Sequence, residues 1–135
     1  MIHNKKFRAR DARKGAAVVE FAVCLPVVVL IVLGSIEAAS LLFLKQTLVQ
    51  ASYEGVKVAI LDSTQAEVEG IIQAVGDGRN VEGLNIEFTP SLIADAAPGE
   101  VITITVSAPG DSNSFIPFGP FSQRTVVGSA SMVKE

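Results

Sequence analysis

One cysteine and one histidine among 135 residues leave this chain short of two common reactive side chains. Cys24 lies inside an apolar run, so no internal disulfide can form, and we interpret the residue as buried apolar filler. The preceding Phe21-Ala22-Val23 makes a poor lipoprotein acylation site. His3 lies in the N-terminal tail, which leaves the rest of the chain without a histidine base or a histidine-containing metal site.

Sequence patterns for catalysis are lacking as well. The chain shows no Ser-His-Asp or Cys-His arrangement and no glycine-rich phosphate loop. The acidic run 77–82 lacks the twelve-residue EF-hand pattern, so we interpret it as a turn, although residue types alone leave a carboxylate-only calcium site open. We therefore predict no enzyme, no cofactor, no metal site and no small-molecule substrate.

Charge is divided by position along the chain. Residues 1–15 hold six of the eleven basic residues and a single acid, Asp11. Residues 16–135 carry five bases and thirteen acids, a formal charge of −8. Nucleic-acid binding requires a clustered basic face, so the acidic body argues against a nucleic-acid partner. The basic tail is typical of a cytoplasmic anchor under the positive-inside rule.

A long apolar run follows the tail. From Ala16 to Ile36 only Glu20 interrupts apolar or small residues, and these 21 positions span about 31 Å as a helix, enough to cross a bilayer. Pro26 lies within the run and is expected to kink or loosen the helix. A carboxylate at the bilayer centre costs about 2.5–3.5 kcal/mol on insertion scales, so Glu20 is a functional candidate.

The window 21–44 is equally apolar apart from Glu37, so the sequence leaves the membrane register open by several residues. We interpret Glu37 as marking the outer membrane–water boundary, with an assembly role as a second interpretation. Six bases before the run, against Lys45 just beyond it, predict a cytoplasmic N-terminus and an extracytoplasmic C-terminal body.

The remaining chain predicts an α+β fold. An apolar stripe at spacings of three and four continues the first helix to about Leu61; its members are Leu41, Leu44, Leu48, Ala51, Gly55 and Val58. Thr64 to Glu67 has capping-box spacing and predicts a second helix to Val75. Alternating or β-branched residues predict strands over 84–88, 102–106 and 124–133. We predict a long transmembrane helix whose amphipathic continuation is covered by a small antiparallel sheet of about three strands.

Several stretches together resemble type IV pilin-like proteins, and more narrowly the TadE-like minor pilins, or pseudopilins, of tight-adherence systems. The first stretch is Lys14-Gly15-Ala16-Ala17-Val18-Val19-Glu20-Phe21 with Pro26, followed by Gly34-Ser35-Ile36-Glu37. Further matches are Lys45-Gln46-Thr47-Leu48, Ala51-Ser52-Tyr53-Glu54-Gly55-Val56, Val101-Ile102-Thr103-Ile104-Thr105-Val106 and Ser129-Ala130-Ser131-Met132-Val133. Residues 62–99 show no match, and Ala38-Ala39-Ser40 stands where the family tends to place an aromatic residue and then Gly-Arg.

This resemblance implies processing and assembly. A prepilin peptidase would cut between Gly15 and Ala16, which divides the chain into a cytoplasmic leader 1–15, a membrane segment 16–37, an amphipathic helix 38–61 and an extracytoplasmic body 62–135. The resemblance assigns Glu20, followed by Phe21, to processing or subunit alignment. Expected partners are the peptidase, other pilins or pseudopilins, the tight-adherence assembly platform and the inner membrane. The expected function is a structural subunit of a Flp-type pilus that supports surface attachment and biofilm formation.

Other interpretations stay open at this point. Phe115, Phe118 and Phe121 form a loop that either contacts another pilin or folds back over the sheet edge. The whole chain could instead be an uncleaved signal-anchored binding or accessory module outside the membrane. A third interpretation is a secreted protein cut by ordinary signal peptidase after Gly34, but the apolar run is longer than a typical signal-peptide core.

Overall fold

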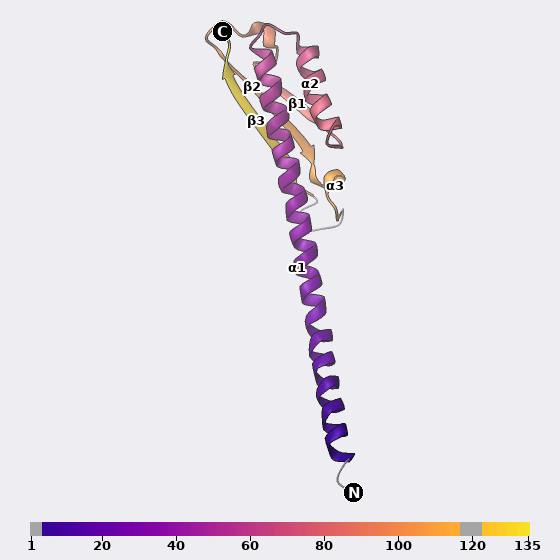
Figure 1. Ribbon diagram of the computed structural model, residues 1–135. Coiled ribbons are helices and arrows are strands. Elements are labelled where there is room, and N and C mark those ends of the chain that lie inside the picture. Colours follow the sequence, from indigo (N-terminus) through magenta and orange to yellow (C-terminus); the bar gives the residue numbers. More distant parts are fainter. Residues whose placement is uncertain (1–3, 117–122) are drawn as a thin grey trace. The chain divides into compact units, whose positions relative to one another are not determined.

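The computed structural model describes the backbone over residues 4–116 and 123–135, and side chains from Lys14 onward within those ranges. The chain divides into two compact units, Met1–Ile36 and Glu37–Glu135. Its helices are α1 (Asn4–Ala59), α2 (Gln65–Asp77), a 3-10 helix η1 (Ile93–Asp95) and α3 (Gly110–Asn113). Its strands are β1 (Asn85–Thr89), β2 (Val101–Pro109) and β3 (Thr125–Val133) (Figure 1). The predicted α+β class is confirmed.

The first unit is entirely helical where it is described. Its side chains from Lys14 to Ile36 are exposed, apart from a half-buried Leu33. Pro26 lies inside α1, whose helical assignment continues on both sides of it. Cys24 is exposed on the single chain, so its expected burial is wrong for the isolated molecule. None of the residues that the structure describes covers this apolar stretch of helix.

The start of α1 also differs from the prediction. The helix begins at Asn4, twelve positions before Ala16, and runs through Gly15 without a break. Residues 4–14 contain no proline or glycine, and Lys, Arg and Ala are good helix formers, so nothing in this stretch stops the helix. One glycine costs about 1 kcal/mol inside a helix, which a helix of this length tolerates.

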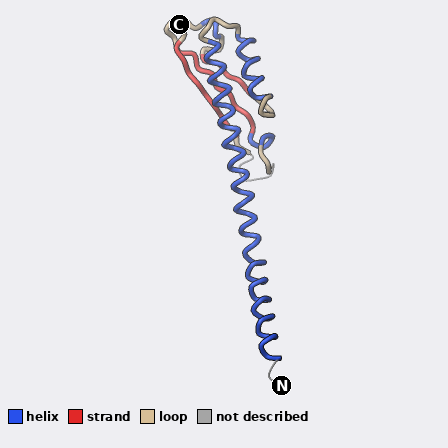
Figure 2. Tube along the Cα trace, viewed as in Figure 1, coloured by secondary structure: helices blue, strands red, loops and turns tan. Residues whose placement is uncertain are grey.

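The second unit is built on a three-stranded antiparallel sheet in the order β1-β2-β3. Ile86 pairs with Val106 in the first ladder, and Val106 pairs with Gly128 in the second. The body half of α1 lies across this sheet with α2 beside it, as the red strands behind the blue helices of Figure 2 show. Each predicted strand is present, and its bounds differ by at most three residues from those expected.

The core lies between these helices and one face of the sheet. The β2 side chains alternate, so Ile102, Ile104 and Val106 are buried while the threonines between them are half-buried. From α1, the predicted stripe supplies Leu44, Leu48, Ala51 and Gly55 as buried residues, while Leu41 and Val58 are half-buried. The stripe was therefore placed correctly, because helical spacing alone decides which residues share a face.

Close approach of β3 to α1 depends on Gly128, the buried residue of that strand. A Cβ at this position would lie 2.5 Å from Leu48 C and Val49 N, so only glycine fits without a shift of backbone. Ser52 Oγ donates to Gly128 O at 3.0 Å, and Lys45 Nζ donates to Val127 O. These bonds fix the strand on the helix at one crossing point.

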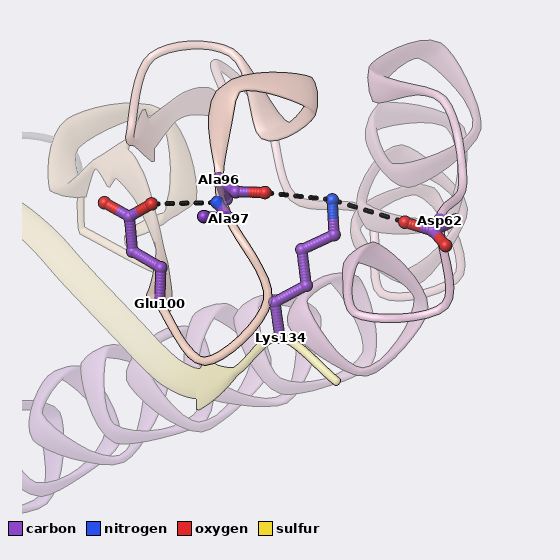
Figure 3. A network of polar contacts seen from close by, with 5 residues as sticks. All are labelled: Asp62, Ala96, Ala97, Glu100 and Lys134. Carbon is purple, nitrogen blue, oxygen red and sulfur yellow. Dashed lines mark hydrogen bonds and ion pairs between the residues drawn. The ribbon is translucent and has the colours of Figure 1, made fainter.

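The far end of the body is tied by the C-terminus. Lys134 Nζ lies 3.2 Å from Asp62 Oδ1 and donates to Ala96 O at 3.2 Å, while Ala97 N donates to Glu100 Oε2 at 2.9 Å (Figure 3). Asp62 is largely exposed, so the ion pair itself is worth about 0–1 kcal/mol. Its use is to join the end of α1, the loop after η1 and the end of β3.

Candidate functional site

The residues expected to be processed and aligned lie on one exposed stretch of α1. A side chain built on Gly15 would meet no atom within 4 Å, and Ala16 beside it is exposed. Glu20 and Phe21 are exposed as well. Positions four apart share a helix face and are separated by about 6 Å along the axis, so Glu20 lies one turn beyond Ala16.

The surroundings of Glu20 are apolar. Val18, Val19, Phe21 and Val23 are all large exposed hydrophobic residues, and the acid stands among them. In a medium of low dielectric constant such a carboxylate is costly unless it is paired or hydrogen-bonded. This stretch can therefore offer a strong, localised attraction for a cation, and can bury its apolar side chains against lipid or another apolar helix.

A second carboxylate, Glu37, is built into the body. Its side chain is 2 % exposed. Ser114 Oγ donates to one carboxylate oxygen, and Ile116 N donates to the other at 3.1 Å. Ser114 Oγ lies 2.9 Å from Ile116 O, which closes a small network between α1 and the residues after α3.

The interpretation of Glu37 as a boundary marker left out this intramolecular role. One signal was present in the sequence, since Glu37 stands four residues before Leu41 and seven before Leu44 on the apolar stripe. Helical phase therefore places it on the buried side. Its partners lie 77 and 79 positions away, and no local pattern identifies them.

Of the three aromatic loop residues, Phe115 is described and is 65 % exposed. Phe118 and Phe121 lie outside the described residues. Contact with a partner, and folding back over the sheet edge, both stay predictions. The interpretation of 77–82 as a turn fits the structure, since α2 ends at Asp77 and residues 78–80 form a turn.

Within the described ranges, no group of three or more His, Cys, Asp or Glu side chains could hold a metal ion. One open depression of about 580 Å³ lies between α1, the turn after α2 and α3. Arg79 lines it and donates from Nη2 to Gln50 Oε1 at 3.1 Å. No arrangement of a nucleophile with a base is present among the residues that line it.

The fold defines the class as an α+β protein. Among the described residues it has one N-terminal helix that is long and apolar enough to cross a membrane, and both carboxylates lie on that helix. Within that class, residues 15–57 match the TadE family, described as TadE-like protein. The chain is thus TadE-like over the segment that contains Gly15, Glu20 and Glu37, as the resemblance indicated. Searches of curated proteins and of solved structures found no match.

The family match covers 43 of the 135 residues, all of them on α1. Residues 15–57 are therefore the part of this chain that is similar to TadE-like proteins. The apolar helix is consistent with anchoring in a membrane.

Proposed function

We propose that this chain is a minor pilin that is processed between Gly15 and Ala16 and then assembled into a tight-adherence pilus, where it supports surface attachment and biofilm formation. Prepilin peptidase is the proposed processing enzyme. Two observations support this position: Gly15 is exposed and unobstructed, and the TadE match begins at that residue. The six bases before it hold the leader in the cytoplasm, and the body lies outside the inner membrane.

The single observation that carries the proposal is the exposed Glu20 one helical turn beyond Ala16, on an otherwise apolar surface. Cleavage creates an ammonium group at Ala16. In apolar surroundings an uncompensated charge costs several kcal/mol, so the amine of one subunit pairs with Glu20 of its neighbour. Because the pair forms at one stagger only, it aligns helix against helix.

The body supplies a second supporting feature. Leu42, Val49 and Tyr53 are exposed hydrophobic residues of α1, on the side opposite the sheet. With Gln46 they fall at spacings of four, three and four, the pattern of a helix that packs against another helix. Other subunits of a helical stack are the natural cover for this row.

The test compares Glu20→Gln with Glu87→Gln, which makes the same charge change on the exposed face of β1. Each variant is expressed in a host that makes tight-adherence pili, and the protein is quantified in membranes and in sheared filaments. We expect both variants in the membrane, with at least a tenfold loss of Glu20→Gln from filaments, since a tenfold change corresponds to about 1.4 kcal/mol. Normal incorporation of Glu20→Gln would contradict the proposal and favour an uncleaved signal-anchored module.

A further inference from the structure

The third strand of the sheet leaves one edge of its backbone open. β3 is an end strand in the order β1-β2-β3, so one of its edges has no neighbouring strand among the described residues (Figure 1). Arg124 O accepts from Gly110 N at 2.8 Å, and Lys134 N donates to Glu100 O at 2.8 Å. The register between these two ends is continuous, so the even-numbered residues of β3 bond to β2. The odd-numbered residues therefore direct their backbone N–H and C=O groups toward the open edge.

The second half of this edge has no cover within the described chain. Lys45 Nζ donates to Val127 O, which agrees with the outward direction of the odd-numbered carbonyls and covers the edge at that position. The outward backbone groups of Ser129, Ser131 and Val133 have no partner among the described residues. Each of these three residues has one N–H and one C=O, so six hydrogen-bonding groups stand at alternate positions over 129–133.

The sequence of β3 also lacks the usual protection of an edge strand. Natural edge strands carry charged side chains, proline or a bulge, which prevent pairing with another chain. Residues 125–133 contain no charged residue and no proline, and their pairing with β2 shows no bulge. An open edge with alternating donors and acceptors is the surface to which an extended peptide adds as a further strand.

We propose that the edge over 129–133 receives an extended segment of a different protein, about five residues long, with a carboxylate where the segment passes Lys45. This inference rests on the proposed function, because the partner is another component of the assembly. Extended backbone supplies the alternating acceptors and donors that the six groups require. The carboxylate follows from charge, since the Lys45 ammonium contacts the neutral Val127 carbonyl and an acid brought to this edge can pair with it.

A second copy of this chain does not fit the edge in such an assembly. Two β3 edges that pair in antiparallel fashion are related by a twofold axis perpendicular to the sheet. The body half of α1 lies along one face of the sheet (Figure 2), so this axis reverses its direction in the second chain. The two chains would then enter the pair at opposite ends, whereas subunits anchored in one membrane enter from the same side.

The first experiment uses the natural chain and requires no variant. Amide hydrogen exchange is measured residue by residue for the detergent-solubilised chain and for the same chain in sheared filaments. In detergent we expect rapid exchange at Ser129, Ser131 and Val133, and slow exchange at Ala130 and Met132, which bond to β2. In filaments we expect the three rapid amides to slow at least tenfold.

The other edge of the sheet provides the internal control. The odd-numbered residues of β1 bond to β2, so Ile86 and Phe88 direct their amides outward. These two amides should exchange at the same rate in both samples. Equal slowing at both edges would assign the protection to general burial in the filament and would contradict strand addition.

Two pairs of variants test the backbone and the charge separately. Ser129→Pro removes one outward N–H at an edge position where a strand tolerates proline, and Ser129→Thr keeps that N–H. Lys45→Gln removes the charge, and Lys57→Gln makes the same change at another exposed residue of α1. Relative to these controls, we expect Ser129→Pro to fall at least tenfold and Lys45→Gln at least threefold in filaments, while both stay in the membrane.

The outcomes separate this inference from the proposed function. If the chain is present in filaments and its three amides exchange as fast as in detergent, strand addition is refuted and the assembly stands. Absence of the natural chain from filaments would refute the proposed function and this inference with it. Protection that develops in the solubilised chain alone as its concentration rises would assign the edge to a second copy. Full incorporation of Lys45→Gln would contradict the acidic partner.

Discussion

At the scale of single residues, two glutamates of the same helix have opposite environments. Glu20 is exposed among apolar side chains, whereas Glu37 is buried and accepts hydrogen bonds from Ser114 and Ile116. A buried carboxylate with two donors is a positioning group, and an exposed one on an apolar helix is available to a partner. Glu37 therefore helps to hold one chain together, whereas joining one chain to another is the role proposed for Glu20.

The role of Glu37 is tested by Glu37→Ala. This change removes the two hydrogen bonds that join residues 114 and 116 to α1, while Ser114 Oγ and Ile116 keep their contacts with each other. A hydrogen bond contributes about 0.5–1.5 kcal/mol, so the loss of two is worth about 1–3 kcal/mol. We expect a loss of this size in urea unfolding of the detergent-solubilised protein, together with faster proteolysis next to residues 114–116. Glu87→Ala, on the exposed face of β1, should change stability by about 0.5 kcal/mol or less. Equal stability of the two variants would show that the Glu37 network contributes nothing.

Sequence pattern could single out Glu20 and Gly15 as candidates because their spacing is local and their surroundings are apolar, and their roles stay predictions. It could also place Glu37 on the buried stripe by helical phase. It could not find Ser114 or Ile116, since pairing across 77 or 79 residues depends on how the sheet returns the chain to α1. Sequence pattern could not show that Phe115 is exposed either, because its position also depends on how the sheet returns the chain to α1.

At the scale of elements, β3 is joined to α1 at one narrow contact. Gly128 brings the strand against the backbone of residues 48 and 49, and hydrogen bonds from Lys45 and Ser52 lie on either side of it. Both contacting segments are backbone, which cannot rotate away as a flexible side chain can. A larger residue here must separate the strand from the helix.

Gly128→Ala is therefore expected to destabilise the body by about 1–3 kcal/mol, the usual cost of overpacking a core. Gly70→Ala is the matched control, because a Cβ there meets no atom within 4 Å on the exposed side of α2, where alanine favours the helix by about 1 kcal/mol. Chemical unfolding of both variants measures the difference. A neutral Gly128→Ala would mean that the sheet and helix are more loosely packed than described.

The start of α2 predicts a dependence on acidity. Thr64 N donates to Glu67 Oε2 at 2.8 Å and the Thr64 side chain also contacts this carboxylate, so hydrogen bonds, mainly that from the backbone, lower the pKa of Glu67 below its ordinary value of 4.5. A lowered pKa in the folded state means that the stabilisation is present above pH 4.5 and is lost as the pH falls through the folded value.

Glu67→Gln isolates this effect from the other carboxylates. We expect the wild-type chain to be the more stable of the two at pH 7, and the difference in urea midpoint to shrink as the pH drops below 4.5. Glutamine keeps the side-chain acceptor of the capping box but not the charge. A difference that is constant between pH 7 and pH 3 would show that the charge of Glu67 has no part in capping.

Among the elements, those with a strong local signal were predictable. The capping box predicted the start of α2 at Thr64, and the alternation of apolar side chains predicted β1 and β2. The short helices η1 and α3 have no periodic pattern of their own and arise where loops fold onto the core, so residue spacing did not reveal them. The extension of α1 back to Asn4 was missed because charge, not helix propensity, suggested a boundary.

At the scale of the whole molecule, the described part of a single chain leaves at least two apolar surfaces uncovered. One is the segment before Glu37, and the other is the row of exposed residues that α1 turns away from the sheet. A membrane can cover the first, while neighbouring helices can cover both. A subunit that moves from a bilayer into a filament needs such uncovered apolar surfaces. A solitary soluble domain that carried them would tend to aggregate.

The most direct test is the intact mass of this protein isolated from sheared filaments of a host with an active prepilin peptidase. Loss of the basic leader is the step that creates the amine for Glu20 to pair with, so the N-terminus decides whether that pair can exist. We predict a chain that begins at Ala16. A filament-bound chain that still begins at Met1 would contradict both the processing and the alignment by Glu20.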